Sequence, residues 1–178
     1  LPNVEAAVAW AADNRSVLYI EKDPQTLLGN RVRRHVLGTD PATDPLVYEE
    51  IDESFYVDVG TTKDGRYLYI HSQSTLSSEQ RYADAADPGH EFRVISPRER
   101  DHEYQADHFD GRWVIRTNWQ APNFRLMEAP VDTSGDRSSW RELVAHGDEA
   151  FVHDFSVFSD FLAIEERSGG LRRLRIRP

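Results

Sequence analysis

Hydrophobic and polar residues alternate along most of the chain in short runs that end at turn residues. Four of these runs share one order: an alternating segment, a tight turn and a more apolar segment. They cover residues 8–20, 56–70, 105–118 and 154–166. A period of two is typical of β-strands that bury one face, so each run predicts a β-hairpin.

The turns of these hairpins carry residues suited to tight reversal. Asp64-Gly65 and Asp110-Gly111 lie between the two halves of their runs. Asp-Gly supplies the positive φ angles of a two-residue hairpin turn, and Asp13-Asn14 in the first run tolerates them. We therefore expect two-residue turns at these places.

Each hairpin is followed by further strand candidates separated by polar connections rich in Pro and Gly. They lie at residues 30–37 and 45–50, 79–85 and 91–96, 123–131 and 140–146, and 170–176. Helical periodicity is scarce, and its best example, a single turn near residues 77–84, falls where a strand is expected. Each module thus has four strands, except the last, which has three.

The modules repeat at a nearly constant spacing. Taking Leu18, Leu68, Val114 and Leu162 as equivalent gives intervals of 50, 46 and 48 residues. Four strands per repeat of this length indicate a β-propeller. We predict an all-β fold, a partial propeller of about 3.75 antiparallel blades in one domain over residues 1–178. The blades would span about 1–50, 51–100, 101–149 and, incomplete, 150–178.

The first strand of each blade is expected to lie nearest the propeller axis, and alternate side chains would pack between blades. Large aromatic residues on the strands are therefore interpreted as packing residues and not as ligand platforms. They are Trp10, Tyr19, Tyr67, Trp113, Phe151 and Phe161.

Charge and composition limit the kinds of ligand and the location that the sequence allows. The net charge is −10 and charges of both signs are mixed along the chain, which argues against a nucleic-acid surface and mildly favours a cationic ligand. The basic run of Arg172, Arg173, Arg175 and Arg177 alternates with apolar residues and fits a solvated strand face. There is no cysteine and no apolar run long enough for a membrane span. We expect a cytoplasmic protein that contacts neither membrane nor nucleic acid.

The segment "RDHEYQADHFDGRW", residues 100–113, concentrates histidine and carboxylate side chains. These residue types bind metals and transfer protons. In a strand, however, His102 and His108 are six residues apart, roughly 20 Å along a straight strand, and no HExxH pattern occurs. A structural role is favoured, and no metal site is predicted.

Several phrases of the sequence resemble one family closely. They are "KDPQTLLGNRVRRHVLGT", "LVYEEIDESFYVDVGTTKDGRYLYIHSQS", "PRERDHEYQADHFDGRWVIRTN", "NFRLMEAP" and "FLAIEERSGGLRRLRI", which together cover almost the whole chain. The chain is similar to the middle of the N-terminal propeller of oligopeptidase B (protease II), in the prolyl oligopeptidase group of serine peptidases. The resemblance implies a seven-bladed ring over an α/β-hydrolase domain that cleaves short peptides after Lys or Arg.

The catalytic residues of that family have no counterpart here. A hydrolase nucleophile requires a G-x-S-x-G elbow between a strand and a helix, and none of the ten glycines begins one. The chain also begins without Met and stops after "LRRLRIRP", a segment that we interpret as a strand. We expect a piece of a longer peptidase, inactive alone, that acts as lid and size filter; the alternative is a stand-alone propeller that binds a protein partner.

The expected partners are the parent's α/β-hydrolase domain, short basic peptides, and further copies of the chain through exposed blade edges. No cofactor site is indicated. Six residues are candidates for contact with a passing peptide, on the innermost strand of the third blade and in two acidic clusters. They are His102, Glu103, Glu49, Glu50, Glu165 and Glu166.

Overall fold

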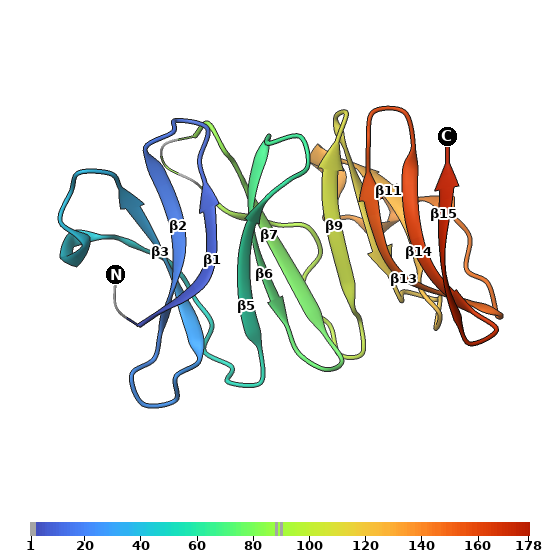
Figure 1. Ribbon diagram of the computed structural model, residues 1–178, viewed down its shortest axis with the longest axis horizontal. Helices are drawn as coiled ribbons and strands as arrows, with labels where there is room; N and C mark the ends of the chain where they lie inside the picture. The colour runs from blue at the N-terminus through green and yellow to red at the C-terminus, as the bar shows by residue number, and fades with distance from the viewer. Residues whose placement is uncertain (1–2, 88, 90) are drawn as a thin grey trace. The chain divides into compact units, whose positions relative to one another are not determined.

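A computed structural model describes residues 3–87, 89 and 91–178. The chain divides into two compact units. The first takes the chain up to Thr75 together with Gln80–Val94, and the second takes Leu76–Glu79 together with Ile95–Pro178. Strand β7 (Ser78–Asp84), labelled in Figure 1, therefore has its first two residues in the second unit and the others in the first.

The first unit contains two antiparallel sheets. One has the order β1 (Val4–Trp10), β2 (Ser16–Lys22), β3 (Gly29–Val36), β4 (Leu46–Glu49), with the 3-10 turn η1 (Pro41–Thr43) before β4. The other has the order β5 (Tyr56–Thr61), β6 (Tyr67–Gln73), β7 (Ser78–Asp84), β8 (Arg93–Val94). Alternate residues of both sheets meet in one core that includes Leu18, Ile20, Val59, Leu68 and Ile70.

The second unit repeats this arrangement. One sheet has the order β9 (Tyr104–Phe109), β10 (Arg112–Thr117), β11 (Arg125–Pro130), β12 (Arg141–Val144), and the turns η2 (Val131–Thr133) and η3 (Arg137–Ser139) precede β12. The other has three strands, β13 (Ala150–Val157), β14 (Leu162–Ser168) and β15 (Leu171–Arg177). Val114, Leu126, Val144, Phe155 and Ile164 belong to the core of this unit.

Each sheet follows chain order, with its first strand at one edge, as in the blade of a propeller. The prediction of an all-β fold built from partial propeller blades is confirmed. The predicted single domain and its blade boundaries stay a prediction. The segment with a weak helical signal, residues 77–84, contains strand β7, which confirms the strand expected there. Among the described residues, no helix is long and apolar enough to cross a membrane.

Of the two Asp-Gly dipeptides predicted to form two-residue turns, one does so. Phe109 pairs with Arg112, and both Asp110 (φ 52°) and Gly111 (φ 77°) have positive φ, as a two-residue turn requires. The two-residue turn at Asp64-Gly65 is wrong, because only Gly65 has positive φ (71°) and the loop closes from Thr62 N to Tyr67 O. There the Asp64 carboxylate accepts the Thr62 hydroxyl and the Arg66 N–H, which stabilises a wider loop.

The aromatic residues that were expected to pack between blades differ in how deeply they are buried. Tyr19 and Trp113 are buried, as packing residues should be, whereas Trp10 is 49% exposed and Phe161 is 37% exposed. Tyr19 also donates a hydrogen bond to Asp44, and burial beside that carboxylate raises the pKa of Tyr19 to about 12. The packing interpretation therefore does not extend to Trp10 and Phe161 among the described residues.

An aspartate recurs on the first strand of three sheets. Its carboxylate accepts the N–H of the next residue: Asp58 from Val59 at 2.9 Å, Asp107 from His108 at 2.8 Å, and Asp154 from Phe155 at 2.8 Å. Strands β5, β9 and β13 are edge strands of their sheets, so alternate N–H groups have no partner strand within the sheet. The aspartates provide these donors with an acceptor.

Candidate functional site

The six candidate residues lie at the ends of strands or in the middle of one strand. We define the proximal end of a sheet as the end at which its first strand begins, and the distal end as the opposite one. Glu49 and Glu50 lie where β4 ends, His102 and Glu103 lie just before β9, and Glu165 and Glu166 lie in the central part of β14 as it runs toward its proximal end. None of the six lies in a distal turn.

His102 is buried, with 4% of its surface exposed, and its ring stacks on Tyr104 at 5.3 Å between centroids. Arg137 donates to its Nδ1 at 2.9 Å, and Nε2 lies 3.0 Å from the Thr117 hydroxyl. Because guanidinium is only a donor, Nδ1 must accept and Nε2 carries the proton. Burial, with Arg137 adding to it, lowers the pKa of His102 to about 4. His102 is therefore a neutral interior residue.

Arg137 connects His102 to the segment that leads into β9. It also donates to the Ser96 hydroxyl at 3.1 and 3.2 Å and to the Glu99 carboxylate at 2.7 Å. The guanidinium group beside Glu99 lowers the pKa of that carboxyl group. The contacts made by His102 all serve to hold this segment in place, and its ring does not reach the surface for a peptide to touch.

Glu50 is likewise an interior residue, 4% exposed. Its carboxylate accepts the Tyr48 hydroxyl at 2.6 Å and the Asp52 N–H at 3.1 Å, which fixes the connection from β4 to β5. Burial and the hydrogen bond to Glu50 raise the pKa of Tyr48. Glu49 is exposed and forms an ion pair with Arg31 at 2.9 Å.

Glu165 and Glu166 each pair with an arginine of the next strand. Glu165 lies 3.1 Å from Arg172, and Glu166 lies 2.5 Å from Arg175. The two glutamates are neighbours in a strand and therefore point to opposite faces of the sheet. They do not form one acidic site.

Glu103 differs from the other candidates. Its backbone N–H is held by the Asn118 side chain at 2.9 Å, but its half-buried carboxylate has no hydrogen bond or ion pair within the described part of the chain. It acts electrostatically on the half-buried Arg116, whose pKa is lowered by burial. Among the five glutamate candidates, Glu103 is the one for which the described residues provide no ion-pair or hydrogen-bond partner for the carboxylate.

The histidines of the segment at 100–113 do not share a ligand. His108 packs edge-on against Trp113 at 5.2 Å, whereas His102 stacks on Tyr104. Throughout the described residues, no three His, Asp or Glu side chains are grouped so as to hold a metal ion.

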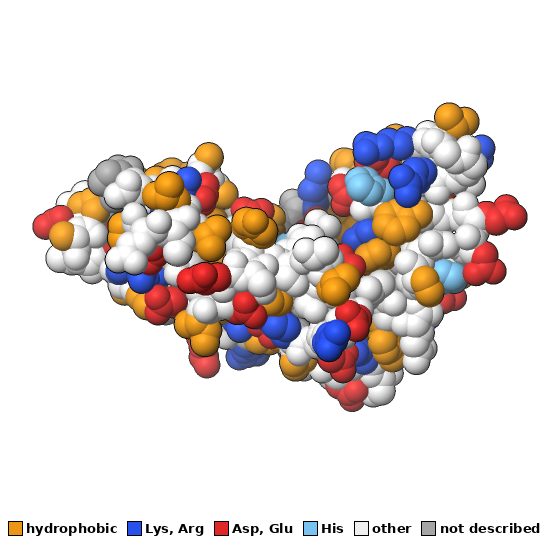
Figure 2. Space-filling model, turned by 90° about the horizontal axis from the view of Figure 1, so that it is seen from below, with side chains coloured by type: hydrophobic (Ala, Val, Ile, Leu, Met, Phe, Trp, Pro, Cys, Tyr) orange, Lys and Arg blue, Asp and Glu red, His pale blue; other side chains and the backbone are white. Residues whose placement is uncertain are grey.

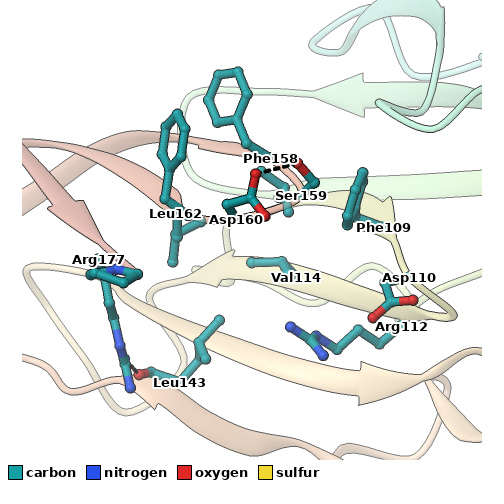
Figure 3. Close-up of a pocket in the computed structure, with 13 residues that line it drawn as sticks. Phe109, Asp110, Arg112, Val114, Leu143, Phe158, Ser159, Asp160, Leu162 and Arg177 are labelled. Carbon is teal, nitrogen blue, oxygen red and sulfur yellow. Dashed lines mark hydrogen bonds between the residues drawn. The ribbon is translucent and has the colours of Figure 1, made fainter.

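A pocket of about 180 Å³ lies at the distal end of the second unit, between the β9–β10 turn and the β13–β14 turn (Figure 3). Phe158 stacks on Phe161 at 4.5 Å, and Ser159 donates to Asp160 at 3.0 Å. Arg177 donates to the carbonyl oxygen of Leu143 on its other side. Among the described residues that line the pocket, none is a histidine that could activate Ser159 as a nucleophile.

A second pocket lies toward the proximal end of the last sheet and was missed by sequence reasoning. It has a volume of about 230 Å³ and is lined by Phe151, His153, Arg167 and Arg172. Phe151 is opposite Arg167 in the ladder, and Arg167 is opposite Arg172. Sequence alone does not show that Phe151, Arg167 and Arg172 lie side by side, because this depends on the strand register. The many arginines near the end of the sequence are the one signal of the pocket that the sequence offers.

The sheets, three of four strands and one of three, each in chain order, define a protein of the β-propeller class. The sequence matches the family described as "Prolyl oligopeptidase, N-terminal beta-propeller domain" over residues 1–178. The chain belongs to this family, and the predicted resemblance is confirmed.

Two related sequences illustrate the match. Dipeptidyl aminopeptidase BI from Pseudoxanthomonas mexicana is 48% identical over 98% of this chain and 24% of its own length. Protease 2 from Moraxella lacunata is 29% identical over 79% of this chain and 20% of its own length. The chain thus spans about a quarter of the length of the curated relatives that it matches.

Two solved structures are also similar to this chain. Oligopeptidase B from Leishmania major superposes with a TM-score of 0.91 at 30% identity, over 98% of this chain and 24% of that one. Oligopeptidase B from Trypanosoma brucei, in a closed form with covalently bound antipain, gives 0.91 at 26% identity, over 99% and 25%. The fold of this chain is therefore similar to that of the matching part of these two structures.

Proposed function

We propose that this chain is part of the propeller lid of a serine peptidase and restricts access to an α/β-hydrolase domain of the same parent protein. The observation that carries the proposal is the match to the propeller family along the whole of residues 1–178. A lid that opens and closes admits short peptides and excludes folded proteins. The closed form of the similar Trypanosoma brucei oligopeptidase B supports this gating.

We further propose that the parent cleaves after Lys or Arg. The net charge of −10 favours cationic substrates, and the available carboxylate of Glu103 offers one a local contact. The likeness to oligopeptidase B supports the same specificity. Glu49, Glu165 and Glu166 are secondary candidates because each already forms an ion pair with an arginine.

A second candidate activity is the removal of dipeptides from a free N-terminus. It is favoured by the 48% identity to a protein named dipeptidyl aminopeptidase BI, a higher identity than that to Protease 2. Both activities place the same propeller over the same type of hydrolase domain. They differ in whether the substrate must carry a free α-amino group.

Two fluorogenic substrates separate these activities in the parent peptidase. One is a dipeptide ending in Arg with a free amino group, and the other is the same dipeptide acylated at its N-terminus. An endopeptidase cleaves the acylated substrate, whereas a dipeptidyl aminopeptidase cleaves only the free one. If neither is cleaved, while a matched substrate ending in Glu is, the proposed basic specificity is refuted.

The size filter is tested with peptides of increasing length around one scissile bond. We expect kcat/KM to fall sharply once the peptide exceeds the length that the closed lid admits. Equal cleavage of the same bond in a short peptide and in a folded protein would contradict gating. The isolated chain should hydrolyse none of these substrates, since it has no G-x-S-x-G elbow.

We also propose that the isolated chain self-associates through β15. All seven residues of this strand are exposed, and Leu171, Leu174 and Ile176 are 64%, 69% and 51% exposed. An edge strand of this kind invites pairing, and a charge placed on it prevents pairing. Light scattering should show oligomers that Leu174→Lys reduces; a monomeric wild-type chain would refute this.

A cytoplasmic location is part of the same proposal, and fractionation of cells that express the parent would test it. The stand-alone interaction module is not favoured by the relatives, which are named as peptidases.

A further inference from the structure

The last sheet carries a concentration of positive charge on an otherwise acidic chain. Between Glu165 and Arg177 there are five arginines and two glutamates, although the whole chain has a net charge of −10. Figure 2 looks toward the proximal end of this sheet, and blue and pale blue side chains gather there beside orange ones at the upper right. The pocket of Phe151, His153, Arg167 and Arg172 lies in this region.

The Phe151 ring, which lines the pocket, lies near two guanidinium groups. Phe151 packs edge-on against Phe124 at 5.4 Å, and the guanidinium of Arg116 lies 5.8 Å from the Phe151 ring centroid. Arg116 is itself fixed, because its Nε donates to the carbonyl oxygen of Val152 at 2.9 Å. The Phe151 ring is therefore positioned before any ligand arrives, which lowers the entropy cost of binding.

Arg167 supplies a cation with no carboxylate partner. Its guanidinium lies 5.9 Å from the Phe151 ring centroid, within cation–π range, and it has no ion pair within the described part of the chain. Arg172 lies opposite Arg167 in the ladder. Facing cations on neighbouring strands are unfavourable unless an anion lies between them.

Arg172 keeps donors available for such an anion. Its Nη1 is paired with Glu165 at 3.1 Å, but its side chain is 74% exposed. An exposed ion pair of this kind contributes little, roughly 0 to 1 kcal/mol, and guanidinium has further N–H donors in a fixed fork. The imidazole of His153 can add one more donor.

We propose that this pocket binds a carboxylate group of a peptide, with Arg167 and Arg172 as its partners and the Phe151 ring against the adjoining carbons. Guanidinium forks match carboxylates in geometry and charge. A volume of about 230 Å³ accommodates this group and its neighbouring carbons but not a folded surface. The carboxylate is either the C-terminus of the peptide or an acidic side chain.

This inference goes beyond the proposed cleavage specificity and is tested by binding alone. The full-length parent is titrated with a tetrapeptide as its free acid, with the same peptide as its C-terminal amide, and with an amide carrying one internal Glu. Isothermal titration calorimetry reports the dissociation constants. The free acid, the Glu peptide or both should bind at least tenfold more tightly than the plain amide, and which one does identifies the source of the carboxylate.

A matched pair of variants locates the site. Arg167→Gln should weaken binding of the preferred carboxylate about tenfold, the effect of losing one charge-assisted hydrogen bond. Arg173→Gln removes the same charge from an exposed neighbour that points to the opposite face of β15, and it should change binding less than twofold. Thermal unfolding by circular dichroism checks that both variants fold.

Two results would overturn the proposal. One is equal affinity for the plain amide and for both carboxylate-bearing peptides. The other is an equal loss for the two variants, because this would indicate a general field of positive charge and not a pocket. Neither result bears on where the parent cleaves, so a failure here is distinguishable from a failure of the proposed function.

Discussion

The buried histidine at position 102 makes a specific prediction about stability and pH. Its pKa is about 4 in the folded chain, compared with 6.5 for an ordinary histidine. As the pH falls, the unfolded chain therefore takes up a proton before the folded chain does. The stabilisation by neutral His102 is complete above about pH 6.5 and is lost as the pH falls toward 4. Between pH 7 and pH 5 the loss amounts to roughly 2 kcal/mol.

Urea unfolding of the wild-type chain and of His102→Gln, followed by circular dichroism at pH 7 and pH 5, measures this loss. Glutamine keeps a donor and an acceptor but does not titrate, so the variant should lose about 2 kcal/mol less over this interval. If the wild type and His102→Gln lost the same unfolding free energy between pH 7 and pH 5, the reasoning would be refuted. If the variant does not fold, NMR titration of the His102 ring decides instead: a midpoint near 6.5 would contradict the buried, neutral state.

Three further predictions concern the sheets. The Tyr69 ring lies directly over Gly60, its cross-strand partner, so Gly60→Ala should displace the ring and destabilise the first unit by about 1–3 kcal/mol in urea unfolding; an unchanged midpoint would contradict this contact. Ile164→Val should cost about 0.5–1.5 kcal/mol because the side chain is fully buried, whereas the same change at the half-exposed Ile176 should cost measurably less. The Ser78 hydroxyl accepts the N–H and donates to the C=O of the first residue of β9, both at 2.6 Å. Ser78→Ala should therefore cost about 1–3 kcal/mol and speed amide hydrogen exchange at the start of β9; an unaltered exchange rate would count against this role.

Much of the fold could be predicted because it depends on local signals. The period-two pattern marks the strands, and the Asp110-Gly111 dipeptide marks a turn whose φ angles few other residues adopt. The pattern fails where side chains alter a loop. At Asp64-Gly65 the Asp64 carboxylate bonds the Thr62 hydroxyl and the Arg66 N–H, and the loop widens by two residues.

The candidate site was less predictable because it depends on register and burial. His102 and Glu50 look like accessible polar residues in the sequence, yet each is 4% exposed and satisfied by its neighbours. Conversely, Arg167 and Arg172 are separated by a turn and become neighbours only when β14 pairs with β15. A sequence shows that charges are present, but the ladder decides which of them face one another.

The aspartates at positions 58, 107 and 154 change how well an extended peptide could pair with the edge strands that carry them. A peptide in extended form binds most simply by adding itself as a strand to an open sheet edge. On β5, β9 and β13, one N–H group that such a peptide would use is already bonded to the carboxylate of the preceding aspartate. An added strand would therefore find fewer N–H donors on these edges. The same side chains that complete the hydrogen bonds of the strands thus make the edges less suited to strand addition.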